Sequence, residues 1–245
     1  MPDHAGASME ASARQGSGLF IAGMLLLTLV FLALGTWQVQ RLFWKLDLIQ
    51  RVEARVNAAA VPPPAETEWQ GFDPVEQEYR HVAASGRLLQ DKEILVQAVT
   101  ELGAGFWVVT PLTRSDGTTI LINRGFVPPD RRDPTTRSKA PTGDLTVTGL
   151  LRLSEPGGAF LRSNDPAGNR WYSRDIAAIA ETQGLSRVAP YFIDADSTAN
   201  PGGYPVGGLT IVRFRNNHLA YIFTWYALAA MTIAATVVLR RKRLV

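Results

Sequence analysis

Two long apolar runs lie near the two ends of the chain. The first covers Gly18 to Leu34 without a charged residue, with apolar character continuing to about Val39, and the second covers Ala220 to Leu239. About 20 helical residues, at ~1.5 Å rise each, cross a hydrocarbon core of ~30 Å. We therefore expect one transmembrane helix over residues 18–39 and another over residues 218–240.

The first run could instead be a cleaved signal peptide, because Ala33 to Gly35 loosely resembles a cleavage site. However, only one basic residue, Arg14, precedes the run, and the run is longer than the ~7 to 15 apolar residues typical of a signal peptide. We therefore favour a retained helix, preceded by an N-terminal tail of residues 1–17.

Basic residues flank both helices, so the orientation rests on where they are most concentrated. Arg240 to Arg243 read "RRKR", at the junction between the second span and a basic tail of residues 241–245. The opposite side carries a more scattered set, Arg41, Lys45, Arg213 and Arg215. Long translocated segments largely escape the positive-inside rule, and about 180 residues separate the two spans. We therefore expect both termini on the inside.

The segment after the first span continues as a helix. Apolar residues recur there at spacings of three and four, which predicts one apolar helical stripe made of Leu42, Leu46, Ile49, Val52 and Val56. Three successive prolines, Pro62 to Pro64, cannot lie in a helix interior and should end it.

Residues 40–217 between the spans are expected to form a β-rich domain. Seven short stretches are rich in β-branched and aromatic residues and are bounded by Gly, Pro, Asp or Ser: "YRHVAASGRLL", "KEILVQAVT", "GFWVVTPLTR", "TTILINRGFVP", "LTVTGLLRL", "PYFIDAD" and "GLTIVRFRN". "TRSDGT" predicts a hairpin turn, and Asp175 can cap a helix that Gly184 ends. The fold class is therefore a membrane protein of α+β type, in which two transmembrane helices flank a mostly antiparallel, small barrel-like domain with one or two helices.

Composition excludes several classes of function. The net charge of +3 and scattered basic residues give no reason to expect a nucleic-acid partner. With 0 cysteines there is no disulfide, thiolate nucleophile or Cys-ligated metal site. The chain lacks a Gly-x-Ser-x-Gly elbow, a Walker phosphate loop and a His-Glu-x-x-His helix, so we expect no enzyme and hold an anchored hydrolase as a remote alternative.

The three histidines are far apart along the chain, which argues against a three-histidine metal site. His4 lies in the tail, and His81 is expected to be a half-exposed strand residue. His218 lies where the second span begins, beside two asparagines and an aromatic cluster. A neutral imidazole there can ligate a metal such as haem iron, titrate near neutral pH, or bind a lipid headgroup or the β domain.

Arginines in the central region have two interpretations. Arg124, in "INRGFVPPDRR", could fork onto a partner's carboxylate or a haem propionate, or form an internal ion pair, and the same choice applies to Arg170 and Arg174. The internal pair is favoured for Arg124. Two long loops, "VPPDRRDPTTRSKAPTGD" and "SEPGGAFLRSNDPAGNR", are of a size typical of mobile or functional segments.

Several of these segments together resemble the surfeit locus protein 1 family. They are "LGTWQVQRLFWKLDLI", "EYRHV", "SGRL", "VVTPL", "ILINRGFVP", "NRWYSRD", "YFIDAD" and "GGLTIVRFRNNHLAYIFTWYALA", in the family's order, from about Leu34 to Ala229. The resemblance implies an inner-membrane protein of bacteria or mitochondria whose central domain faces the periplasm or intermembrane space. It also implies an assembly factor of cytochrome c oxidase that assists insertion of haem a into subunit I or stabilises that subunit, with subunit I, other assembly factors and membrane lipid as partners.

On that resemblance, His218 is expected as the haem-handling residue or axial metal ligand, with haem a bound transiently. Trp225 and Tyr226 would line the same end of the helix, and cations at Arg41, Arg213 and Arg215 would meet the propionates. Some family members carry a histidine where this chain has Tyr172, so no second ligand is expected from that loop. The alternative is a structural chaperone that clamps oxidase subunits without binding haem.

Overall fold

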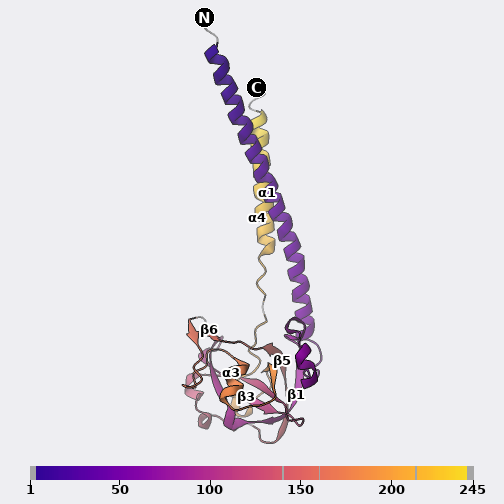
Figure 1. Cartoon of the computed structure of the whole chain (residues 1–245), viewed down its shortest axis with the longest axis vertical. Helices are drawn as coiled ribbons and strands as arrows, with labels where there is room; N and C mark the ends of the chain where they lie inside the picture. Colours follow the sequence, from indigo (N-terminus) through magenta and orange to yellow (C-terminus); the bar gives the residue numbers. More distant parts are fainter. Residues whose placement is uncertain (1–3, 140, 160, 213, 242–245) are drawn as a thin grey trace. The chain divides into compact units, whose positions relative to one another are not determined.

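The computed structural model describes residues 4–139, 141–159, 161–212 and 214–241, with side chains from residue 18 onward. The chain divides into two compact units, one made of Met1–Gln50 with Arg213–Val245 and the other of Arg51–Val212. Figure 1 shows two long helices and a β-rich domain as the main parts of the chain. Arg213, one of the expected propionate-binding cations, lies outside the described residues.

The two long helices are α1 (His4–Val56) and α4 (His218–Arg241). Their segments 18–56 and 218–241 are long and apolar enough to cross a membrane. As expected from the apolar stripe, α1 continues well past the first span, and it ends before the three prolines. The helix already begins at His4, so residues 4–17, assigned to a tail from the sequence, have a helical backbone.

Helices α1 and α4 contact each other through small and hydroxyl-bearing residues. Thr28 and Thr232 join their hydroxyls at 2.8 Å, and Thr36 lies 3.3 Å from the Tyr226 hydroxyl. A Cβ at Gly35 would meet the Tyr226 ring at 3.0 Å, so glycine lets this ring approach the α1 backbone. Close packing and polar contacts of this kind hold helices together in lipid, where the hydrophobic effect does not. Contacts between side chains of α1 and α4 therefore hold the two helices together.

The central unit is a small barrel. Its strands are β1 (His81–Leu88), β2 (Ile94–Thr100), β3 (Gly103–Thr113), β4 (Thr119–Val127), β5 (Asp144–Leu153) and β8 (Val188–Ala195). Their order is β1-β5-β8-β4-β3-β2, and β1 also pairs with β3 through Arg87↔Thr113 and Leu88↔Leu112. That last pairing closes five strands into a ring, with β2 attached outside it along β3.

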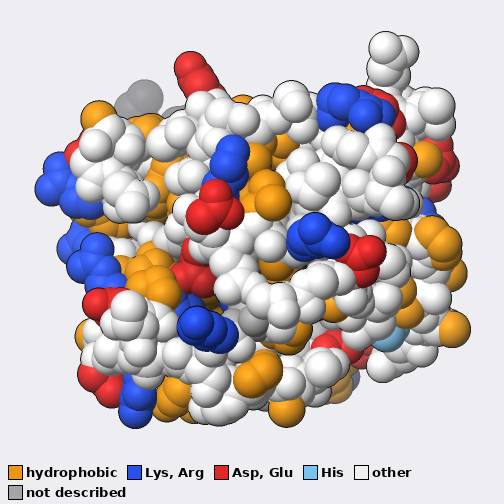
Figure 2. Space-filling view, turned by 90° about the horizontal axis from the view of Figure 1, so that it is seen from below, with side chains coloured by type: hydrophobic (Ala, Val, Ile, Leu, Met, Phe, Trp, Pro, Cys, Tyr) orange, Lys and Arg blue, Asp and Glu red, His pale blue; other side chains and the backbone are white. Residues whose placement is uncertain are grey.

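Short elements complete the domain. Two strands of two residues each, β6 (Gly158–Ala159) and β7 (Arg162–Ser163), pair as a hairpin. The two short α-helices are α2 (Pro74–Gln77) and α3 (Ile176–Thr182). The 3-10 turns are η1 (Glu66–Gly71), η2 (Gln90–Lys92), η3 (Pro129–Arg131), η4 (Pro134–Thr136) and η5 (Pro201–Gly203). On the face of the domain in Figure 2, basic and acidic side chains are interspersed among small apolar groups.

These elements confirm the expected fold class, a mostly antiparallel small barrel flanked by two apolar helices. The β3–β4 hairpin turns at Gly117, where φ is +79°, and the Asp116 carboxylate accepts hydrogen bonds from the amide and hydroxyl of Thr118. Asp175 caps α3 by accepting from the amide of Ala178 at 3.2 Å. One pairing departs from the antiparallel expectation, because β4 and β8 run parallel.

The prediction of a seventh strand, in "GLTIVRFRN", is wrong. Its described residues, 208–212 and 214–216, form no strand. The segment starts beside β8, where the Gly208 amide donates to the carbonyl of Ala195. Since β8 is already paired on both edges, to β5 and to β4, no strand edge is left there for a β-branched segment to join. Strand propensity alone does not provide a pairing partner.

The core has two layers, separated by the barrel wall. On β4, Ile120 and Ile122 point into the barrel, while Leu121 points outward to a second cluster with Trp171 and Ile179. The same alternation holds on β8, because successive side chains of a strand point to opposite faces. All nine residues of β4 are buried, so this strand is covered on both faces.

Candidate functional site

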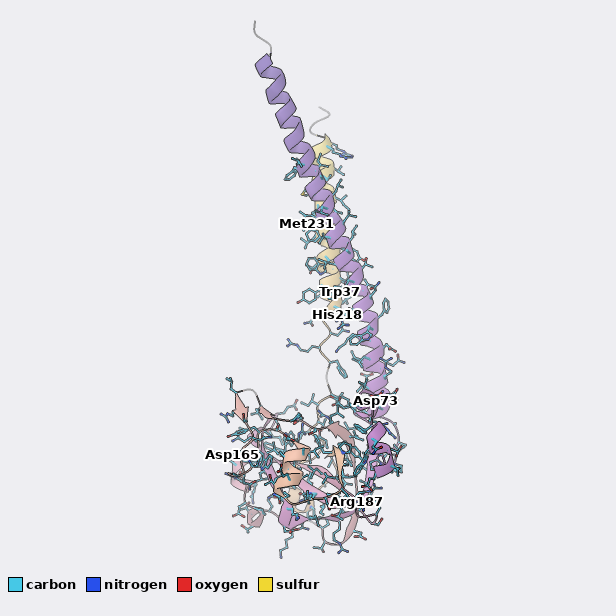
Figure 3. All side chains as sticks on the ribbon, viewed as in Figure 1. Trp37, Asp73, Asp165, Arg187, His218 and Met231 are labelled. Atoms are coloured by element: carbon cyan, nitrogen blue, oxygen red, sulfur yellow. The ribbon has the colours of Figure 1, made fainter. Side chains whose placement is uncertain are left out.

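His218 is held by a residue of the other helix. It is the first residue of α4 (Figure 3), and its backbone amide donates to the side-chain oxygen of Asn216 at 3.4 Å. Its ring Nδ1 lies 2.7 Å from Oε1 of Gln38 on α1, and Gln38 is itself buried. Because an amide oxygen only accepts, this contact is a hydrogen bond when Nδ1 carries the ring proton, and Nε2 of the neutral ring then keeps its lone pair.

That arrangement matches what an imidazole ligand requires. Metal-bound histidines donate their other ring N–H to an oxygen, which fixes the tautomer and ring orientation. No group of three or more His, Cys, Asp or Glu side chains is placed to hold a metal ion among the residues that the structure describes. A single imidazole held in this way could bind a metal that takes one protein ligand, such as the iron of a haem.

Trp225 and Tyr226 lie about two turns further along α4, and both contact α1. The ring of Trp225 stacks on Phe31 with centroids 5.9 Å apart, and its buried Nε1 has no hydrogen-bond partner. Tyr226 packs against Gly35 and reaches Thr36. Residues seven and eight apart on a helix share a face with the first, so both aromatic rings lie on the His218 side of α4.

Of the cations expected to meet the propionates, the structure describes Arg41 and Arg215. Arg215 is exposed, three residues before His218. Arg41 lies over the ring of its neighbour Trp44, 4.3 Å from the centroid, and Lys45 lies 4.8 Å from the ring of Phe214. The sequence pattern gives no indication of the contact between Lys45 and Phe214.

The three candidate arginines of the domain, Arg124, Arg170 and Arg174, form internal ion pairs, as favoured for Arg124. Arg124 pairs with Glu93 at 3.7 Å, and Arg170 with Asp165 at 2.5 Å. Arg174 pairs with Glu155 at 2.5 Å. Burial raises the pKa of Glu155, but the hydrogen bonds and charge of Arg174 outweigh it and hold that pKa below its usual range.

Asp194 is a structural centre that the sequence did not indicate. This carboxylate is 3% exposed and accepts four hydrogen bonds: from Asn123 at 2.7 Å, Arg174 at 2.8 Å, Arg152 at 3.2 Å and Thr210 at 2.8 Å. Burial lowers the pKa of Arg174, yet Asp194 and Glu155 together raise it. The signal available was an acidic residue inside the apolar stretch "YFIDAD", since a buried charge must be paired.

His81 behaves as expected of a half-exposed strand residue. It is partly buried at the start of β1, and its Nδ1 lies 2.8 Å from the carbonyl oxygen of Ala58. His4 is the first residue of α1, and its side chain is outside the description. His81 joins no group of three or more His, Cys, Asp or Glu side chains among the described residues.

Comparison with known proteins agrees with the motifs. The model of the SURF1 family matches residues 25–230. Surfeit locus protein 1 of Mus musculus is 41% identical over 229 residues, covering 85% of this chain and 72% of the relative, and that of Homo sapiens is 40% identical over 232 residues, covering 85% and 73%. A SURF1-like protein of Monosiga brevicollis is 36% identical over 249 residues, covering 96% and 92%. The chain therefore belongs to the SURF1 family.

Proposed function

We propose that this chain is a membrane-anchored assembly factor of cytochrome c oxidase that offers His218 as an axial ligand to haem a during assembly of subunit I. Membership of the SURF1 family supports the role in oxidase assembly. The observation that carries the haem-handling part is the 2.7 Å contact between His218 Nδ1 and Gln38. It leaves Nε2 as the nitrogen with a lone pair for iron.

Bound haem would bring an iron that takes nitrogen ligands and a large apolar ring. Gln38 holds the Nδ1 proton and so orients the imidazole. Trp225 and Tyr226 would provide aromatic side chains on the same side of α4, where Trp225 stacks on Phe31 of α1. Arg215, an exposed cation three residues before His218, is available for a propionate.

The spectrum of the purified full chain tests this role. From cells that make haem a, the wild-type chain should co-purify with haem, and His218→Ala should lose nearly all of it. Gln38→Leu should reduce occupancy by about 10- to 100-fold, because it removes the partner that orients the ligand. His81→Ala is the matched control, since His81 also contacts an oxygen through Nδ1, and should retain haem. Equal haem content in the wild type and His218→Ala would overturn the haem-handling role.

A structural chaperone without haem is the second candidate. It is favoured by exposed aromatic side chains on α1, namely Trp37, Phe43 and Trp44. Large exposed aromatic groups are typical of contact surfaces. On this candidate, His218→Ala leaves oxidase yield normal, while changing Trp37 and Trp44 abolishes co-purification with subunit I.

The proposed topology places both termini inside and the barrel in the periplasm or intermembrane space. Two candidate spans and the family support an inner-membrane protein. Because the chain has 0 cysteines, single introduced cysteines report accessibility without background. Ser115→Cys, in the exposed β3–β4 turn, should react with a membrane-impermeant maleimide added outside intact cells or spheroplasts, and Ser8→Cys should react only after lysis. The opposite labelling pattern would reverse the topology.

A further inference from the structure

A pocket of about 380 Å³ opens on the barrel domain beside Arg124 of β4. It is lined by residues of the loop that follows β4, among them Arg137, Ser138 and Lys139, and by two other segments that contribute Glu93 and Tyr204. Its volume falls in the range of small-molecule sites, ~300–1,000 Å³. The oxidase-assembly role assigns nothing to it.

Two arginines converge on a single carboxylate in this pocket. Arg137 donates to Glu93 Oε1 at 2.5 Å, and Arg124 lies 3.7 Å from Glu93 Oε2. The side chains are 4%, 8% and 11% exposed for Arg137, Arg124 and Glu93. Arginine is the cation best suited to such a partly buried position, because its fork binds oxyanions through paired hydrogen bonds.

Positive charge in the pocket exceeds negative charge. Arg124, Arg137 and Lys139 line it, and Glu93 is the one carboxylate among its lining residues. Burial lowers the pKa of Arg124, Glu93 opposes that effect, and the charge of Arg137 adds to the lowering. The neighbouring Asp133 does not line the pocket, and its carboxylate accepts hydrogen bonds from the amide and hydroxyl of Thr135.

One donor in the cluster is unsatisfied. The Nε–H of Arg137 is buried and has no hydrogen-bond partner. A buried donor left unpaired loses its hydrogen bond to water without a replacement, and such groups are rare in native proteins. An oxyanion in the pocket would compensate the excess charge and provide acceptors for the guanidinium groups.

Contacts within the protein fix the segments that form the pocket. Asn200 donates to the Pro205 carbonyl at 2.6 Å and accepts from Arg124 at 3.3 Å. Gly202 has φ +69°, and a Cβ there would collide with the Ser138 hydroxyl. Two segments distant in sequence, 134–139 and 200–205, are therefore packed closely against each other around the arginines.

We propose that this pocket binds the phosphate group of a small ligand. Arg137 and Lys139 would bind its charged oxygens, while the hydroxyls of Ser138 and Tyr204, which line the same pocket, are further donors. A phosphate has enough acceptor oxygens for several such donors at once. The ligand is either free inorganic phosphate or a phosphate monoester, such as a glycerol phosphate headgroup.

Calorimetric titration of the detergent-solubilised full chain tests the proposal. Inorganic phosphate and sn-glycerol 3-phosphate are titrated separately against sodium chloride of equal ionic strength. Lys139→Gln should weaken phosphate binding about tenfold or more, because it removes a charge-assisted hydrogen bond. Lys139 is exposed, so this variant should fold normally.

Lys92→Gln is the matched control. It removes the same charge from the same domain, but the Lys92 ammonium donates to the carbonyl of Gln183 and does not line the pocket. It should bind phosphate as the wild type does. Binding of both titrants points to the phosphate group itself, and binding of the monoester alone points to an organic phosphate. Failure of both to bind the wild type, or equal weakening by the two lysine variants, overturns the proposal, and neither result bears on haem content.

Discussion

Asp194→Asn should lower the free energy of unfolding of the barrel domain by about 3–5 kcal/mol, the range for breaking a buried charge network. The carboxylate accepts hydrogen bonds from two arginines, one on each oxygen. Whichever way an asparagine amide is turned, its NH2 group faces an arginine N–H, so a donor meets a donor. Arg174 and Arg152 then stay buried with less compensation.

Urea unfolding of the full chain in detergent, followed by circular dichroism, measures this loss. Asp144→Asn is the matched control, because its carboxylate is 80% exposed and pairs with Arg87 at 3.5 Å on the surface. Surface changes of this kind usually alter stability by no more than ~0.5 kcal/mol. If both variants unfold at the wild-type urea concentration, the Asp194 network does not stabilise the barrel.

Trp171→Ala should destabilise the same domain by about 3–5 kcal/mol, the cost of deleting a large buried aromatic side chain. The Trp171 ring is 1% exposed and fills the outer core layer between the barrel and α3. Its Nε1 donates to Asn169 at 2.9 Å, and its carbonyl accepts from the Gln97 amide of β2 at 2.8 Å. Removing the ring therefore leaves a cavity beside the strand that is attached outside the ring.

Thermal unfolding of this variant should be compared with that of Val99→Ala on β2. Val99 is 86% exposed, so its truncation removes little buried surface and should shift the midpoint only slightly. Trp171→Phe, which keeps an aromatic ring, should fall between the two. A midpoint for Trp171→Ala as high as that of Val99→Ala would show that the outer layer contributes little stability.

Local pattern was enough to predict most elements of the fold. Enrichment in β-branched and aromatic residues located the six long strands, and turn and cap chemistry at Asp116–Gly117 and Asp175 located the β3–β4 turn and the start of α3. The parallel pairing of β4 with β8 was missed because about 60 residues separate them, and pairing over that distance leaves no local signal. The false strand at Gly208 has the same cause, since strand propensity does not reveal which edges are already occupied.

Of the candidate site, sequence could name His218 but not its partner. Gln38 lies 180 residues earlier in the chain, and its contact depends on how two apolar helices pack. The arginines were expected in internal pairs, yet which carboxylates they meet follows from the barrel's strand order. Asp194 and the Glu93 pocket therefore became visible only with the fold.

The position of β8 determines when the barrel can form during synthesis. It is the last long strand in the chain, yet it lies between β5 and β4 in the ring. Until the ribosome has made residues through Ala195, β4 and β5 lack the strand that pairs with both of them. Unpaired strand edges attract other chains, so we expect the nascent domain to be prone to aggregation between the completion of β5 and that of β8.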